Sequence, residues 1–199
     1  MGLLKTLLSS VVAGICIAIG GVAYLKVGGL EGAVLFSFGL LSVTHYALWL
    51  YTGTAGFFDI KCFRQWVETF IVLLGNVMGC WIVALSVRTA LPSLLEVAAN
   101  IANTRLSSGF LNDFILGCGC GFIMTTSVQF ARLGRYLPLL FGVPLFIMCG
   151  FAHSIADAFY LLLNYTETFS NHDLICAWLS VVGGNFVGCN IYRLTLWKF

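Results

Sequence analysis

The sequence predicts an all-α, polytopic membrane protein whose six transmembrane helices form two inverted three-helix repeats. Three observations lead to this prediction. Of the 199 residues, 60% are hydrophobic and only 9% are charged, whereas about a quarter of a soluble domain is charged. The apolar residues also fall into six stretches, most of them close to the roughly 20 residues that a spanning helix needs. Finally, one six-residue motif occurs twice, at 75–80 and 184–189.

The spans follow from the apolar stretches in chain order. The second span is expected to lose its regularity through 46–57. The fifth is expected to break near 150–153, where Gly150 permits a change of direction. The six spans cover residues 7–25, 31–46, 67–87, 109–131, 137–163 and 174–195.

Residues 89–108 are expected to be a surface connector, because they contain Pro92, Glu96 and Arg105 between apolar stretches. The chain then reads as a single transmembrane domain over 1–199, with repeat one at about 1–88, the connector at 89–108 and repeat two at 109–199. Six helices with short loops leave no room for a separate soluble domain. A net charge of +2 is too small to indicate a nucleic-acid partner.

Positive charges set the expected orientation, because cytoplasmic loops carry an excess of Lys and Arg. With the N-terminus inside, the opposite side carries Lys26, Arg88 and Arg105. The cytoplasmic segments carry more cations, namely Lys5, Lys61, Arg64, Arg132, Arg135, Arg193 and Lys198. Both termini are therefore expected in the cytoplasm, with the protein in the plasma (inner) membrane.

Eight cysteines are present, and all but one lie within apolar stretches, where thiols behave as small hydrophobic groups. Cys118 and Cys120 are two residues apart and so point to different faces of a helix. No CxxC pair is present, so neither a metal site nor a cofactor is expected.

The repeated motif is Gly-Asn-x-x-Gly-Cys. Its first copy contains Gly75, Asn76 and Gly79, and its second contains Gly184, Asn185 and Gly188. Small residues four apart let membrane helices approach closely. The asparagines either bond neighbouring backbone at the helix breaks or line a pore directly. Because each half contains three spans, the two copies must lie upside down relative to each other, as in many channels and transporters.

The interruption in the fifth span is the most informative segment, because it places His153 inside the membrane. Such a break exposes a half-helix N-terminus, whose N–H groups attract anions. An intramembrane histidine indicates a functional site, and its usual pKa of about 6.5 suits protonation of a weak acid or pairing with an anion. His45 lies a similar distance before the first motif and is expected to mirror His153.

Two further polar residues have open roles. Thr52 either hydrogen-bonds a polar solute or satisfies loop backbone. Asp157, one turn after His153, either pairs with that imidazole, which would favour its charged form, or bonds elsewhere within the protein.

Several of these segments resemble the formate/nitrite transporter family. Residues 150–157, Gly-Phe-Ala-His-Ser-Ile-Ala-Asp, are similar to its fifth-helix signature GFEHSxAN. The two GNxxG segments match those of its third and sixth helices, residues 32–40 match the start of its second helix, and 50–52 match its Leu-Phe-Thr loop. The similarity covers about 30–195.

The resemblance implies a pentamer with one pore per protomer and an aquaporin-like fold whose second and fifth helices are broken. It implies that His153 is the central pore histidine and that Thr52 contacts it or the solute. The residues it implies at constrictions are Leu50, Tyr51, Phe36, Leu40 and Phe146. The implied substrates are small monovalent anions such as formate, nitrite and hydrosulfide.

The sequence also departs from the family pattern. Ala152 replaces a glutamate, Asp157 replaces an asparagine, and Cys118 aligns with a polar asparagine of the fourth helix. Trp49 replaces an acidic residue, and His45 has no counterpart in the pattern.

Three functions are compatible with these features. The first is a membrane channel or transporter for small monovalent anions, without enzymatic activity. The second is a pore for neutral solutes such as water or urea, although aquaporin NPA repeats are absent. The third is a redox protein in which His45 and His153 ligate a haem, although these histidines flank breaks instead of lying on continuous helices.

Overall fold

The computed structural model describes residues 2–57, 61–164 and 171–194. The described residues are helical throughout apart from short connections and contain no strand, which confirms the predicted all-α class. The helices are α1 (Leu3–Val27), α2 (Gly29–His45), α3 (Tyr51–Thr54), α4 (Phe63–Ala90), α5 (Leu94–Ser108), α6 (Phe110–Arg132), α7 (Leu137–Met148), α8 (Ser154–Leu163) and α9 (Asn171–Asn190), followed by a 3₁₀ turn at Ile191–Leu194.

Four helical stretches in the described part are long and apolar enough to cross a membrane: Leu3–Val27, Phe63–Ala90, Phe110–Arg132 and His172–Leu194. They correspond to the expected first, third, fourth and sixth spans. The expected second span corresponds to α2, and the one-turn helix α3 lies in the segment 46–57 that was expected to be irregular. Residues of the expected fifth span form α7 and α8. Each of these pieces is shorter than a membrane-crossing helix.

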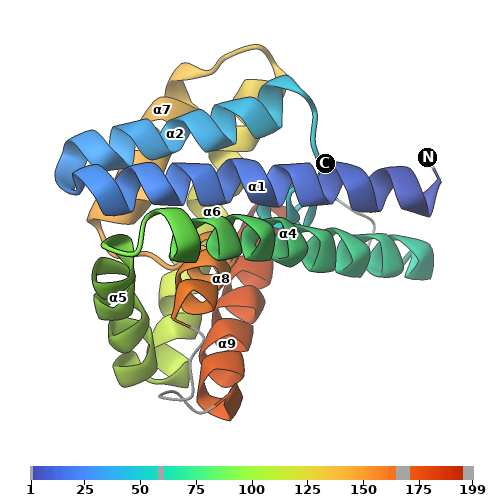
Figure 1. Cartoon of the computed structure of the whole chain (residues 1–199). Coiled ribbons are helices and arrows are strands. Elements are labelled where there is room, and N and C mark those ends of the chain that lie inside the picture. The colour runs from blue at the N-terminus through green and yellow to red at the C-terminus, as the bar shows by residue number, and fades with distance from the viewer. Residues whose placement is uncertain (1, 58–60, 165–170, 195–199) are drawn as a thin grey trace.

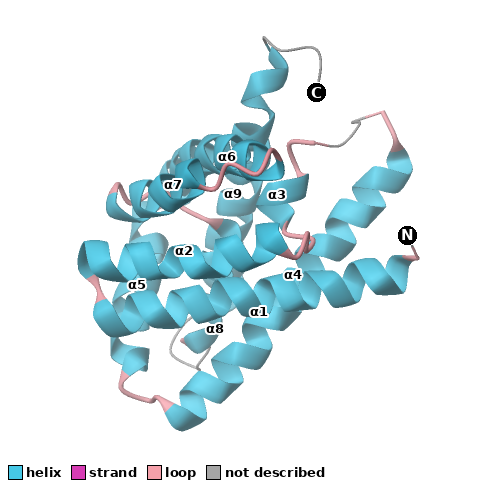
Figure 2. Cartoon of the chain, turned by 90° about the horizontal axis from the view of Figure 1, so that it is seen from above, coloured by secondary structure: helices cyan, strands magenta, loops and turns pink. Residues whose placement is uncertain are grey.

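Glycines allow the helices to pack backbone against backbone. Helix α1 lies between α2 and α4, while α6 packs along α9 (Figures 1 and 2). A Cβ atom added to Gly14 of α1 would overlap the carbonyl of Asn76 in α4. In the same way, a Cβ on Gly188 of α9 would overlap the carbonyl of Cys118 in α6. Glycines inside and outside the repeated motif, such as Gly188 and Gly14, therefore permit the close approach of helices that small residues provide.

Most of residues 89–108, the expected connector between the two repeats, form helix α5. Leu94, Ala98 and Ala102 recur at a spacing of four and are buried, which is the pattern of a helix with one packed face. This face lies against α8 and brings Arg105 next to the interruption of the fifth span.

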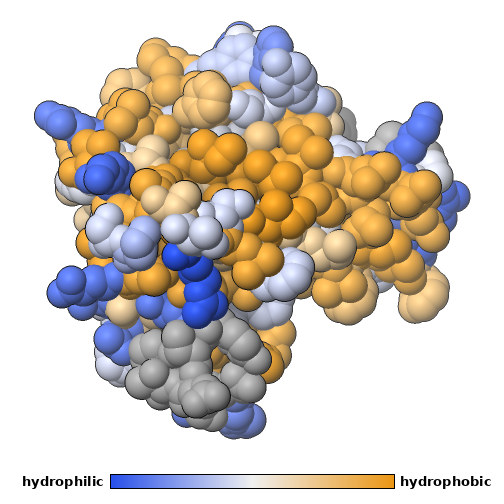
Figure 3. Space-filling view, viewed as in Figure 1, coloured by the Kyte–Doolittle hydropathy of each residue, from blue (hydrophilic) through white to orange (hydrophobic). Residues whose placement is uncertain are grey.

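The surface suits a lipid environment. Apolar residues cover α1 and α4 along their length, and hydrophilic residues gather towards their ends (Figure 3). Large apolar side chains are exposed on these two helices, among them Leu4, Leu8, Ile19, Phe70 and Trp81. An exposed apolar area of this extent marks contact with lipid or with other protein chains.

Candidate functional site

The chain between α7 and α8 turns at Gly150 and brings His153 into the core. Gly150 has a positive φ of 75°, a conformation that glycine adopts without steric cost. His153 caps the N-terminus of α8: its Nδ1 accepts a hydrogen bond from the backbone N–H of Ala156 at 3.2 Å. The imidazole is only 2% exposed, so the interruption holds it in a fixed, buried position.

The side chain of Asn185 in α9 hydrogen-bonds the backbone on both sides of His153, and we say that it brackets this residue. Its Oδ1 accepts from the N–H of Ser154 at 2.8 Å, and its Nδ2 donates to the carbonyl of Ala152 at 2.8 Å. Nδ2 also donates to the carbonyl of Gly117 in α6 at 2.9 Å. One buried amide therefore satisfies the backbone on both sides of the interruption and ties it to the long helices α6 and α9.

Asn76 of α4 brackets Leu50 with an equivalent set of bonds. Its Oδ1 accepts from the N–H of Tyr51 at 2.8 Å, and its Nδ2 donates to the carbonyls of Trp49 at 2.9 Å and Ser10 at 2.8 Å. Leu50 thus precedes α3 as His153 precedes α8.

His45 does not mirror His153, contrary to the expectation from the sequence. It lies at the exposed C-terminal end of α2, edge-on to the ring of Tyr46, with ring centroids 4.9 Å apart. The bracketed position in the first half belongs to Leu50. The expectation was wrong because it used the number of residues between each histidine and the motif that follows it. The position equivalent to His153 is instead the one whose flanking backbone groups bond the motif asparagine.

The two interruptions meet through Thr52 and His153. The hydroxyl Oγ1 of Thr52 lies 3.0 Å from Nε2 of His153, and both side chains are buried. Because Nδ1 accepts the N–H of Ala156, it carries no proton. The proton of the neutral ring is therefore on Nε2, which donates to Thr52. The hydroxyl of Thr52 is thus occupied by the imidazole, not by loop backbone.

Apolar side chains surround this pair. The ring of Phe146 stacks on that of His153 with centroids 5.5 Å apart, and Phe36 meets Phe146 edge-on at 6.0 Å. Leu40, one turn after Phe36, is buried like the rings. The hydroxyl of Tyr51 points elsewhere and donates to the carbonyl of Val182 in α9. We call Phe36, Leu40, Leu50, Thr52, Phe146 and His153 the central cluster.

A cavity of about 260 Å³ lies on the Leu50 side of the central cluster. Arg132 of α6 lines it, donates to the carbonyl of Gly53 at 2.9 Å and lies over the ring of Phe57 at 3.9 Å. Threonines add hydroxyl groups to the same wall. We call it the Arg132 cavity; it is lined by Val43, Thr44, Ala47, Leu48, Trp49, Leu50, Gly53, Thr54, Val128 and Arg132.

A second cavity, of about 180 Å³, lies on the His153 side and also contains an arginine. The Nε of Arg105 lies 3.2 Å from Oδ2 of Asp157, and its NH1 lies 3.8 Å from Asp113, which accepts from Ser108. Asp157 thus pairs with Arg105, not with the imidazole. We call it the Arg105 cavity; its lining includes Tyr24, Thr104, Arg105, Phe146, His153 and Asp157.

One expected site residue lies outside the cavities, and three residues of the site were not expected. Cys118 does not line either cavity in the described part of the chain, because its helix face packs on Gly188. Arg105, Asp113 and Arg132 were not among the expected site residues. The spacing of Arg105 from Ala98 and Ala102 places it on the buried face of α5, which is the sequence signal that could have found it.

A comparison with protein-family models shows to which family the chain belongs. The model of the family described as "Formate/nitrite transporter" matches residues 1–197. The chain belongs to the formate/nitrite transporter family. This confirms the resemblance inferred from the motifs. A comparison with curated proteins gave no match.

Solved channel structures share the fold of this formate/nitrite transporter family member. One, a "Pentameric formate channel with formate bound", superimposes with a TM-score of 0.82 at 22% identity, covering 98% of this chain and 95% of that chain. Another, an "FNT family ion channel", gives a TM-score of 0.86 at 20% identity, covering 98% of this chain and 89% of that one. The chain therefore has the helical fold of these channels along nearly its whole length.

Proposed function

We propose that this protein is a membrane channel for small monovalent anions such as formate, nitrite or hydrosulfide. The observation that carries the proposal is the buried Thr52–His153 pair, at 3.0 Å, between two cavities that each contain an arginine. Leu50 lines one cavity and His153 lines the other, so the central cluster separates them by a few side chains. An anion crosses by moving from one cavity through the central cluster into the other.

Two arginines and a helix N-terminus supply positively polarised groups along this path. Arg132 lines one cavity, and Arg105 lines the other beside Asp157. The N-terminus of α8 begins directly after His153 and adds the partial positive charge of a helix N-terminus. Arg105 is balanced by the carboxylates of Asp157 and Asp113, so among the described residues the uncompensated arginine on this path is Arg132. The family membership supports transport of an anion.

Within the central cluster, His153 assists the anion as a hydrogen-bond donor. Its Nε2–H, which points to Thr52, can be shared with an anion oxygen, while Nδ1 remains bound to the N–H of Ala156. Protonation of a weak-acid anion requires the imidazolium, and the imidazolium forms only if Nδ1 gives up that bond. The geometry therefore favours electrostatic assistance by the neutral ring over permanent charge.

Apolar side chains limit what passes. Phe36, Leu40, Leu50 and Phe146 surround the polar pair with rings and aliphatic groups. Such constrictions remove water from a solute, so a large or strongly hydrated ion is excluded. A small anion recovers part of its lost hydration from Thr52 and His153.

The proposal includes the architecture around the pore. In it, α2 with α3 and α7 with α8 act as broken spans, and 1–88 and 109–199 form inverted repeats. The matching bonds of Asn76 and Asn185 support this arrangement. We further propose a homopentamer in the plasma membrane with cytoplasmic termini. The pentameric channel of similar fold and the positive charges of the sequence support these points.

The geometry gives no support to the haem alternative. Both ring nitrogens of His153 are occupied by protein groups, and His45 lies on the exposed end of α2. A pore for neutral solutes would not need an arginine in each cavity, so the anion channel is preferred.

Flux measurements test the proposal. The protein is reconstituted in liposomes, and uptake of formate, nitrite, hydrosulfide and urea is measured between pH 5 and pH 8. The unaltered protein should pass the anions and exclude urea. His153→Phe should lower anion flux at least about tenfold, because the substitution removes the only hydrogen-bonding groups of the ring.

His45→Ala is the matched control, since it removes the other predicted intramembrane histidine from an exposed position. It should leave both the flux and its pH dependence unchanged. Urea flux equal to formate flux, or full anion flux in His153→Phe, would contradict the proposed function.

A further inference from the structure

Helix α9 holds both members of the Thr52–His153 pair from one face. Asn185 bonds the backbone on either side of His153. Four residues later, the thiol of Cys189 donates to the carbonyl of Thr52, with Sγ 3.5 Å from the oxygen. Residues four apart lie on the same face of a helix. One helix face therefore sets the positions of two groups that lie 101 residues apart in the chain.

The carbonyl of Thr52 depends on this thiol. Thr52 lies in a single helical turn, Tyr51–Thr54, whose last carbonyls have no partner within the helix. In the described part of the chain, the thiol of Cys189 is the donor that reaches this buried carbonyl. The thiol also contacts the carbonyl of Gly121 in α6 at 3.5 Å, so it links α3, α6 and α9.

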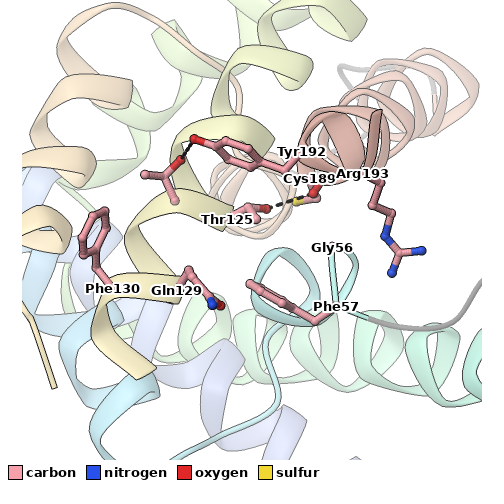
Figure 4. A pocket seen from close by; sticks show the side chains of 9 residues that line it. Gly56, Phe57, Thr125, Gln129, Phe130, Cys189, Tyr192 and Arg193 are labelled. Atoms are coloured by element: carbon pink, nitrogen blue, oxygen red, sulfur yellow. Dashed lines mark hydrogen bonds between the residues drawn. The ribbon is translucent and has the colours of Figure 1, made fainter. Parts of the chain in front are cut away.

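The contact between α3 and α9 is close at this point. A Cβ on Gly56, just after α3, would lie 2.5 Å from the carbonyl oxygen of Cys189. Figure 4 shows Gly56 beside Cys189, whose carbonyl accepts from Thr125 of α6 at 3.3 Å. Asn190 donates in addition to the carbonyl of Ala55 at 3.0 Å. The C-terminal turn of α9 thus contacts α3 at Thr52 and the two residues after α3, Ala55 and Gly56.

The first copy of the motif makes the corresponding cross-connection. The thiol of Cys80 in α4 donates to the carbonyl of Ile155 at 3.4 Å, in the opposite half of the chain. Ile155 lies in the first turn of the ten-residue helix α8, where the helix itself supplies a backbone donor. The loss of Cys80 therefore leaves this carbonyl partnered, whereas the loss of Cys189 leaves that of Thr52 without a partner.

We propose that Cys189 is a positioning residue for the central cluster. Its thiol holds the backbone of Thr52 so that the hydroxyl faces Nε2 of His153, and the distance within that pair sets how the imidazole is shared with a passing anion. This inference rests on the proposed channel function and adds a determinant of its rate and pH dependence.

The test compares Cys189→Val, Cys189→Ser and Cys80→Val by formate flux in liposomes between pH 5 and pH 8. An S–H···O bond is weak, so Cys189→Val should lower flux only about two- to five-fold. It should also shift the pH profile in the same direction as Thr52→Val. Cys189→Ser replaces the thiol donor with a hydroxyl donor and should restore the pH profile. Cys80→Val should have the pH profile of the unaltered protein.

The double variant Thr52→Val/Cys189→Val separates positioning from general packing. If Cys189 acts through Thr52, the double variant should have the pH profile and flux of Thr52→Val alone. Multiplied losses, or equal shifts in Cys189→Val and Cys80→Val, would overturn the inference and leave the channel proposal intact. Full flux in both Thr52→Val and His153→Phe would overturn the channel proposal itself.

Assembly is checked by gel filtration of each purified variant before reconstitution. If Cys189→Val does not assemble, Cys189→Ala gives the same comparison, because it removes the donor without adding bulk. A normal pH profile in assembled Cys189→Ala would also overturn the inference.

Discussion

The hydroxyl of Thr52 and Nε2 of His153 lie 3.0 Å apart in the core, although 101 residues separate them in the chain. Among the described residues, neither atom has another side-chain hydrogen-bond partner. The bond joins the start of α3 to the start of α8 through two polar side chains. Changes at this bond should therefore alter function more than stability.

Replacement of Thr52 tests the bond directly. In Thr52→Val the side chain keeps its shape but cannot accept the Nε2–H of His153, which is then left buried without a partner. An unsatisfied buried donor costs about 1–3 kcal/mol, so formate flux should fall about tenfold and its pH dependence should change. Thr52→Ser keeps the hydroxyl and should retain most of the flux; equal losses in both variants would contradict this role.

Asn185 should be essential for folding. Its amide satisfies the N–H of Ser154 and the carbonyls of Ala152 and Gly117 at once. Asn185→Leu leaves the N–H of Ser154 and the carbonyl of Ala152 buried without a partner, whereas the carbonyl of Gly117 keeps its donor within α6. The loss should destabilise the protein by at least about 2 kcal/mol. Thermal unfolding in detergent measures the loss. Asn112→Leu, on the exposed side of α6, should unfold within a few degrees of the unaltered protein.

Two adjacent glycines of α9 should respond differently to alanine. A Cβ on Gly184 would overlap the carbonyl of Phe114 and the Cα of Gly117, whereas a Cβ on Gly183 meets the ring of Phe114 at 3.5 Å. Gly184→Ala should therefore force α6 and α9 apart and cost about 1–3 kcal/mol or more. Gly183→Ala should be neutral or slightly stabilising. Similar unfolding temperatures for the two variants would disprove the close packing.

Replacing Arg105 should destabilise the protein more than replacing its partner Asp157. Arg105→Gln leaves the carboxylates of Asp113 and Asp157 buried without a cation, and breaking a buried pair costs about 3–5 kcal/mol. Asp157→Asn leaves Arg105 near Asp113, at 3.8 Å, and should cost less. Denaturation in detergent ranks the two variants. Arg105→Gln should also reduce anion flux, because it removes the cation of that cavity; greater damage from Asp157→Asn would reverse this assignment.

Features that depend on residues close together in the chain could be predicted from the sequence. The long apolar stretches indicated α1, α4, α6 and α9, because lipid imposes a length and composition that neighbouring residues report. The interruption near 150–153 could also be predicted, because Gly150 and His153 stand within an apolar stretch. The repeated Gly-Asn-x-x-Gly-Cys motif, together with residues 150–157, was sufficient to indicate the family, which the match over 1–197 confirmed.

Partners across the molecule depend on how the helices pack, and the tertiary structure alone decided them. It put Leu50 instead of His45 at the bracketed position and paired Asp157 with Arg105. It also placed the hydroxyl of Thr52 on His153, one of the two contacts that the family resemblance had implied. A helix spacing states which face a residue occupies, but not which distant helix covers that face. The close approaches at Gly14, Gly184 and Gly188 fix those neighbours, and the resulting backbone contacts decide which polar groups meet in the core.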